Sequence, residues 1–127
     1  MLASDLERII DEHAYTQDGD KIGKVGTVYL DDASGEPEFV TVKTGLLGTK
    51  ESFAPVRDAR ITDDGLVLPY DKDRVKNAPK VDKDQHLSPA EERDLYDYYG
   101  VPFAENPEPV EEPGRVRLRE YVVTERR

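Results

Sequence analysis

The chain has 127 residues, a formal charge of -10 and no cysteine. Its length suits one domain, and the absence of cysteine excludes disulfides, thiolate zinc sites and a cysteine nucleophile. The acidic excess repels phosphate, so we expect no nucleic-acid partner. The sequence has no apolar run long enough to cross a bilayer and does not open as a secretion signal, so we expect no membrane insertion and a cytoplasmic location.

Charge is distributed unevenly along the chain. Residues 1–87 hold 12 Lys or Arg against 18 Asp or Glu, whereas residues 88–113 hold 1 against 8. Residues 114–127 are basic, with 5 against 2. A basic segment therefore ends an otherwise acidic chain.

The first half of the chain predicts one helix and then a series of short strands. Ser4 and Glu7 fit a capping box ahead of apolar residues at helical spacing, which predicts a helix over residues 5–12. Gly23 and Gly26 predict a bulge or bend in the strand that follows. Strands are expected at residues 22–30, 38–44, 51–56, 58–62 and 66–70, separated by Gly and Asp turns. About 60 residues of such strands favour a small antiparallel β-barrel, in a mainly β chain with short flanking helices.

The second half begins with a polar, irregular stretch over residues 71–86. A helix over residues 88–99 follows, because Ser88 is a good N-cap, Pro89 suits the first helical turn and Glu91 completes a capping box. Gly100 is the expected stop. Four prolines then predict an extended acidic linker over residues 101–114.

Several segments of the first hundred residues match one known family in their order and spacing. They are Ile22-Gly23-Lys24-Val25-Gly26, Val28-Tyr29-Leu30-Asp31, Phe39-Val40-Thr41-Val42, Gly45-Leu46-Leu47-Gly48, Phe53-Ala54-Pro55, Asp63-Asp64-Gly65 and the helix from Leu87 to Gly100. On these segments, residues 15–100 resemble the PRC-barrel domain, the small β-barrel of the photosynthetic reaction-centre H subunit and of a bacterial ribosome-maturation factor. The resemblance implies a module that docks on, or tunes, a larger assembly. In the reaction-centre relative the barrel adjusts electron and proton delivery to quinone.

Residues 115–125 resemble the opening strand of a conserved domain of unknown function that follows PRC-barrels in bacterial stress-associated proteins. A lone strand is not stable by itself, because its backbone donors and acceptors lack partners. We therefore expect a fragment or natural truncation of a two-domain protein. Its parts would be an N-terminal helix (1–14), the barrel with its C-terminal helix (15–100), a linker (101–114) and a strand remnant (115–127).

The acidic turns do not predict a metal site. Loops beginning at Asp18 or Asp82 lack the ligand spacing of a helix-loop-helix calcium site. Asp31 and Asp32 with Glu36 could hold a cation only weakly, and a solvated hairpin turn explains them better. We therefore assign no metal ligand.

The two histidines, His13 and His86, do not predict catalysis. Neither has a Ser or Cys nucleophile at a suggestive spacing, so helix-terminal capping or simple exposure explains each one better. We assign no catalytic residue and no cofactor, and expect a protein that is not an enzyme.

Two groups of residues are candidates for an interface. Leu46 and Leu47 lie between glycines in a loop, where they either tuck under the barrel or face a partner. Tyr96 and Tyr99 share one face of the predicted C-terminal helix. Tyrosine is enriched at interfaces, although packing of this helix on the barrel explains the pair equally well.

These expectations favour a non-catalytic interaction or regulatory β-barrel module with a stress-associated role. Its partner would be a protein or a second copy, bound through the barrel or the C-terminal strand. The alternatives are a barrel that binds a small ligand or metal ion, and a tuning domain on an electron-transfer complex.

Overall fold

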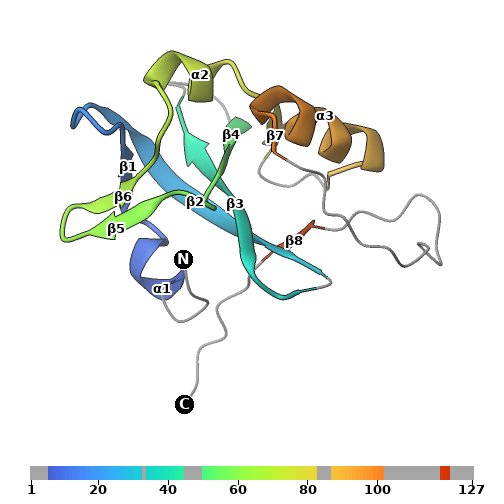
Figure 1. Cartoon of the computed structure of the whole chain (residues 1–127), viewed down its shortest axis with the longest axis horizontal. Coiled ribbons are helices and arrows are strands. Elements are labelled where there is room, and N and C mark those ends of the chain that lie inside the picture. The colour runs from blue at the N-terminus through green and yellow to red at the C-terminus, as the bar shows by residue number, and fades with distance from the viewer. Residues whose placement is uncertain (1–5, 33, 45–49, 83–86, 102–117, 121–127) are drawn as a thin grey trace.

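The computed structural model describes residues 6–32, 34–44, 50–82, 87–101 and 118–120, and these form short helices around a single sheet (Figure 1). The helices are α1 (Leu6–Ile9), α2 (Lys72–Lys76) and α3 (Pro89–Tyr99). The strands are β1 (His13–Tyr15), β2 (Lys21–Asp31), β3 (Pro37–Lys43), β4 (Lys50–Pro55), β5 (Arg60–Thr62), β6 (Gly65–Val67), β7 (Lys80–Asp82) and β8 (Leu118–Glu120). None of these three helices combines the length and apolar character that a membrane crossing needs.

The sheet runs in the order β5-β6-β1-β2-β3-β4-β7, and β8 is added to β2. Most neighbours are antiparallel, but β1 and β6 are parallel. Within the described residues β5 and β7 share no ladder, so hydrogen bonds do not close the sheet into the antiparallel barrel that we expected. A parallel pair needs a long crossover, and here most of the sheet lies between β1 and β6 in sequence. Strands β5, β6 and β7 have three residues each and therefore offer few backbone groups for closure.

Buried apolar side chains form two clusters, one on each face of the curved sheet. The first cluster lies on its inner face and contains Ile9, Ala14, Ile22, Val25, Val28, Leu30, Val40, Val42, Ala54, Val56, Leu66, Leu68 and Val75. The second cluster, which we call the outer cluster, contains Tyr29, Phe39, Phe53, Ala78, Leu87, Leu95, Tyr96, Tyr99 and Leu118. Because successive residues of a strand point to opposite faces, β2, β3 and β4 each contribute to both clusters. Both faces of the central strands are therefore buried.

Strand β2 bends at its middle, as its glycines predict. The register against β3 shifts between Val25 and Val28. A Cβ atom at Gly23 would collide with the Lys43 carbonyl, and one at Gly26 would collide with the Glu51 carboxylate. The two halves of β2 have different neighbours on the edge away from β3: residues 21–24 pair with β1, and residues 29–31 pair with β8.

Helix α3 has the ends that the sequence predicts. The Glu91 N–H donates to the Ser88 hydroxyl at 3.2 Å, and the Ser88 N–H donates to Glu91 Oε1 at 2.9 Å. Pro89 occupies the first turn, and Gly100 ends the helix with φ 67°. The capping box and the left-handed stop fix where α3 begins and ends, and its buried residues Leu95, Tyr96 and Tyr99 form the side that faces the sheet.

Helix α2 is fastened to α3 by Arg74 and Tyr98. The Arg74 guanidinium donates to the Tyr98 carbonyl at 2.9 Å, and the Tyr98 hydroxyl donates to the Arg74 carbonyl at 2.7 Å. The guanidinium also lies 5.2 Å and 5.5 Å from the ring centroids of Tyr98 and Tyr99. These contacts hold the two helices together, although the buried Val75 of α2 belongs to the first cluster and α3 packs in the outer cluster.

Several elements differ from the sequence prediction. Helix α1 covers residues 6–9 rather than 5–12, and His13 lies in the unpredicted strand β1. Residues 71–86, expected to be irregular, contain α2 and β7. Elements of three to five residues are too short to show a period of 2 or 3.6, which explains the misses. Ser4, His86 and the predicted linker from residue 102 onward lie outside the described residues.

Candidate functional site

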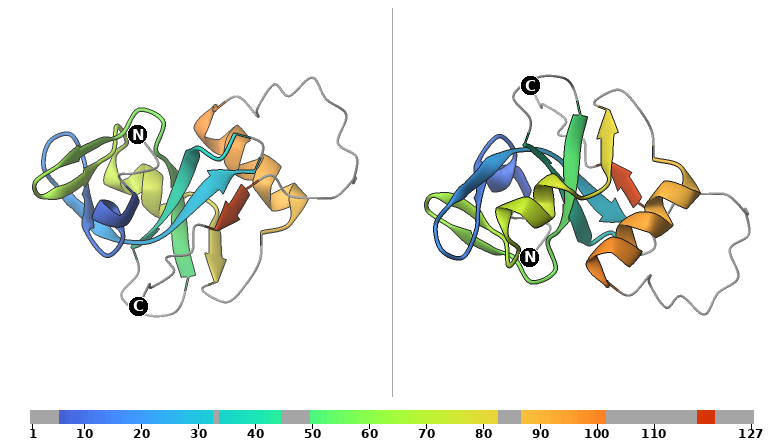
Figure 2. Two further views of the ribbon diagram at one scale, coloured as in Figure 1. Left: turned by 90° about the horizontal axis from the view of Figure 1, so that it is seen from below. Right: turned by 90° about the horizontal axis from the view of Figure 1, so that it is seen from above.

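The most specific arrangement of side chains surrounds β8. This strand lies along the distal half of β2, with Asp31 opposite Leu118, Leu30 opposite Arg119 and Tyr29 opposite Glu120. Figure 2 shows β8 next to α3 and the end of β2. We give the name β2–α3 groove to the set of residues that contact β8, which are residues 29–32 and Glu92 of α3.

Helix α3 contributes a buried carboxylate to this groove. Glu92 is only 1% exposed, and its Oε2 accepts the backbone N–H of Leu118 at 2.7 Å. A charge-assisted bond of this kind to a buried amide is stronger than a neutral one, and removing the acceptor would leave the amide unsatisfied. The Leu118 side chain, 4% exposed, packs in the outer cluster. One residue of β8 is therefore held by both its backbone and its side chain.

The other two residues of β8 bind to β2 and its turn. The Tyr29 hydroxyl donates to Glu120 Oε1 at 3.3 Å, on the same side of the strand as Leu118. On the opposite side, Arg119 Nε lies 3.3 Å from Asp32 Oδ1. Both partners of that ion pair are partly exposed, so it contributes at most about 1 kcal/mol and acts mainly on register.

A polar network lies at the bend of β2. The Thr41 hydroxyl donates to Glu51 Oε1 at 2.5 Å, and the Thr27 N–H donates to Thr41 Oγ1 at 2.9 Å. Thr41 and Glu51 are both buried. The network satisfies a backbone donor that the bulge removes from the β2–β3 ladder, so a structural role explains it.

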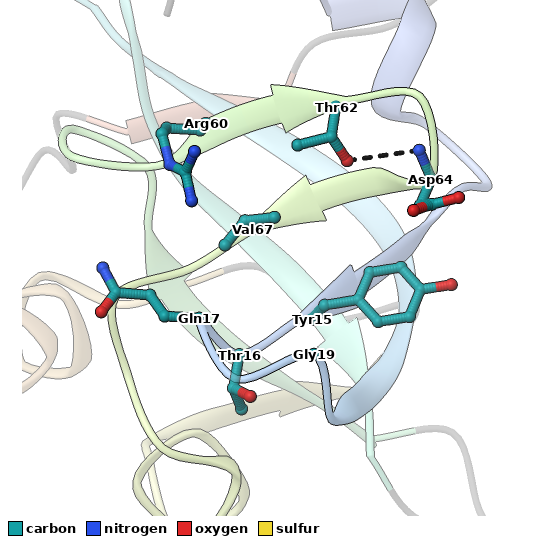
Figure 3. Close-up of a pocket in the computed structure, with 8 residues that line it drawn as sticks. All are labelled: Tyr15, Thr16, Gln17, Gly19, Arg60, Thr62, Asp64 and Val67. Atoms are coloured by element: carbon teal, nitrogen blue, oxygen red, sulfur yellow. Dashed lines mark hydrogen bonds between the residues drawn. The ribbon is translucent and has the colours of Figure 1, made fainter.

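A pocket of about 410 Å³ lies elsewhere, between the β1–β2 turn and the β5–β6 hairpin (Figure 3). Figure 3 shows Arg60 and Gln17 on one side and Asp64 and Tyr15 on the other. The Thr62 hydroxyl accepts the Asp64 N–H at 3.2 Å, which fixes the hairpin turn. The pocket is open to the surface and carries one cation and one anion, a lining that suits a small polar molecule.

Two of the four candidate interface residues are described by the structure, and both are buried. Leu46 and Leu47 lie outside the described residues. Tyr96 is 3% and Tyr99 7% exposed, and both belong to the outer cluster, as the packing alternative predicts. The Tyr99 hydroxyl donates to the Phe53 carbonyl at 2.6 Å. We therefore place no docking surface on these two side chains.

The titratable candidates that the structure describes do not assemble into a site, and His86 lies outside the described residues. His13 pairs with Lys24 and Gly65 in the sheet, and its ring centroid lies 6.4 Å from that of Tyr15. Asp31 Oδ2 accepts the Ser34 N–H at 3.0 Å, as in a hairpin turn. Among the residues that the structure describes, no three His, Asp or Glu side chains are grouped as a metal site would require.

A comparison with protein-family models matches residues 3–75 to the PRC-barrel domain. The chain belongs to the PRC-barrel family. The match ends in α2, short of the predicted boundary at residue 100, and does not reach the residues from which we predicted a second conserved domain. A comparison with curated proteins finds no match. In this PRC-barrel protein, β2 lies inside the matched region, whereas α3 and β8 lie outside it.

Sequence reasoning missed the groove because its parts are far apart in the chain. Tyr29 and Glu120 are 91 positions apart, and Glu92 and Leu118 are 26 positions apart. One signal was available: a basic segment of strand-forming residues follows an acidic chain. That pattern predicts a strand that must pair with the edge of a sheet, but it does not identify the strand with which it pairs.

Tyr29 makes the attachment of β8 sensitive to alkali. Burial, and next the Glu120 carboxylate, raise the pKa of Tyr29 well above its ordinary value. A raised pKa means that folding favours the neutral phenol, so its stabilisation is complete below about pH 10 and is lost as the pH rises further. We expect the free energy of unfolding from urea titrations to fall above about pH 10. Tyr29→Phe should flatten this fall, and an identical slope in both proteins would contradict the assignment.

Proposed function

We propose that this PRC-barrel protein is a non-catalytic interaction module that binds an extended protein segment along the distal half of β2, in the position that β8 occupies. The observation that carries the proposal is the β2–α3 groove itself. Three side chains from separate elements, Glu92, Asp32 and Tyr29, converge on β8. Addition of a strand to a sheet edge is a common mode of peptide recognition, in which backbone bonds supply affinity and side-chain contacts supply selectivity.

The edge of β2 in this groove is covered by another element of the chain. An unpaired edge invites indiscriminate association, and proteins cover such edges with other elements. Here β8 covers the distal half of β2, and Glu92 in turn binds an amide of β8. The site is consequently filled in cis, and a segment from a protein partner must compete with β8. The proposed cytoplasmic and stress-associated setting rests on the sequence and on family resemblance alone.

Leu118→Asp in the full chain tests this proposal. An aspartate beside Glu92 and within the outer cluster should expel β8 while leaving the groove residues unchanged. A fluorescent peptide of residues 115–124 should then bind at least tenfold more tightly to the variant than to the parent protein, because a tethered strand competes at an effective concentration on the order of millimolar. Circular dichroism checks that the variant remains folded. Equal affinities, or no binding to a folded variant, would contradict the proposal.

The alternative function, a barrel that binds a small ligand, is favoured by the pocket between the β1–β2 turn and the β5–β6 hairpin. A ligand that binds only the folded state raises its melting temperature. A shift with small zwitterionic metabolites that is abolished by Arg60→Ala would favour this alternative. Unchanged melting across such a set would count against it.

A further inference from the structure

We infer that the β2–α3 groove selects a net-basic segment of another protein with an aliphatic residue, a cation and a carboxylate at consecutive positions. This inference rests on the proposed function and adds the class of segment that is bound. The three positions are those of Leu118, Arg119 and Glu120, each of which has a separate partner.

The first position requires an aliphatic side chain on a residue that retains its backbone N–H. The Leu118 side chain is buried in the outer cluster, and its amide is bound by Glu92. Proline has no N–H to offer Glu92, and a charged side chain would be desolvated among aromatic rings. Glu92 and Asp32 also give the groove two carboxylates, which favour a cationic segment.

The second and third positions select charged side chains of opposite sign, on opposite sides of the strand. The cation meets Asp32, and the carboxylate accepts from Tyr29. A slip of one residue turns every side chain to the other face, so a cation would enter the outer cluster and an aliphatic residue would face Asp32. The order of the three residues is therefore selected together with their identities.

The favoured occupant is a different protein rather than a second copy. If two copies exchange β8, each strand makes the same contacts as before but is no longer attached to the chain that it binds. The exchanged dimer is therefore not favoured at protein concentrations below the effective concentration of the attached strand, which is on the order of millimolar. Net charge supports the same choice, because a second copy also carries a formal charge of -10 and is repelled, whereas a net-basic partner is attracted.

Peptides with reversed charges at the second and third positions test this selectivity. The protein is the full chain with Leu118→Asp, and the probes are three fluorescent peptides of residues 115–124: the parent peptide, one with Arg119→Glu and one with Glu120→Lys. We expect the Arg119→Glu peptide to bind up to about fivefold more weakly, the ratio for the upper value of a partly exposed ion pair. The Glu120→Lys peptide, which loses the hydrogen bond from Tyr29, should bind about fivefold more weakly, the ratio for a typical hydrogen bond. Adding Asp32→Arg to the protein should weaken the parent peptide and restore binding of the Arg119→Glu peptide.

The outcomes separate this inference from the proposed function. Equal binding of all three peptides would overturn the selection of sequence and leave strand binding intact. Failure of Asp32→Arg to rescue the Arg119→Glu peptide would overturn the assignment of the second position. Binding of no peptide to a folded variant would overturn the proposed function as well.

Discussion

Phe39→Ala is expected to lower the free energy of unfolding by about 3–5 kcal/mol, the range for removing a buried aromatic side chain. Phe39 is completely buried in the outer cluster. Its ring centroid lies 5.0 Å from that of Tyr96 and 6.4 Å from that of Phe53, both in edge-on arrangements. Such pairs add about 0.5–1.5 kcal/mol beyond the buried area. The alanine variant therefore loses both the packing volume and the contact that joins α3 to the sheet.

Phe39→Leu is the matched control. It keeps most of the volume and loses the ring contacts, so we expect a cost of about 1 kcal/mol. Urea unfolding followed by circular dichroism measures both variants. Added to the Leu118→Asp chain, Phe39→Ala should also weaken binding of the peptide of residues 115–124, because α3 supplies Glu92 to the groove. Similar small losses for both variants would contradict the role assigned to the outer cluster.

The sequence predicts best those elements whose signals are local. The helix at α3 follows from Ser88, Pro89, Glu91 and Gly100, whose roles depend only on neighbouring backbone atoms, and the structure confirms all four. The bend in β2 follows in the same way from Gly23 and Gly26. Membership of the PRC-barrel family is likewise confirmed by the family match.

The groove could not be predicted, because it depends on pairing between distant segments. The sequence gives residues 118–120 a strand-forming character and a positive charge, and the lack of an obvious neighbour led us to expect a remnant of a second domain. In the structure these three residues join the sheet of the barrel domain at β2. The free edge exists because β1 covers only the first half of a long, bent strand. Nothing local to either segment carries that information.

A disulfide between β2 and β8 is expected to produce the second large effect. Leu30 and Arg119 are directly opposite in the antiparallel ladder, where Cβ atoms are typically about 4.5–5.5 Å apart. A small adjustment brings such a pair within disulfide range. The bond would close a loop of roughly 90 residues and stabilise the folded state by about 4 kcal/mol in the chain-entropy account. Denaturant unfolding of the oxidised and reduced Leu30→Cys/Arg119→Cys protein measures this difference.

The formation of that disulfide is the most direct test of the central claim, that β8 fills the β2–α3 groove of its own chain. The native sequence contains no cysteine, so any disulfide joins the two introduced residues. Leu30→Cys/Glu120→Cys is the control, because residue 120 projects to the other face of the strand. Mass spectrometry and non-reducing electrophoresis should show an intramolecular bond in the Leu30/Arg119 pair and little in the control. Equal cross-linking of both pairs, or cross-links only between chains, would contradict the account.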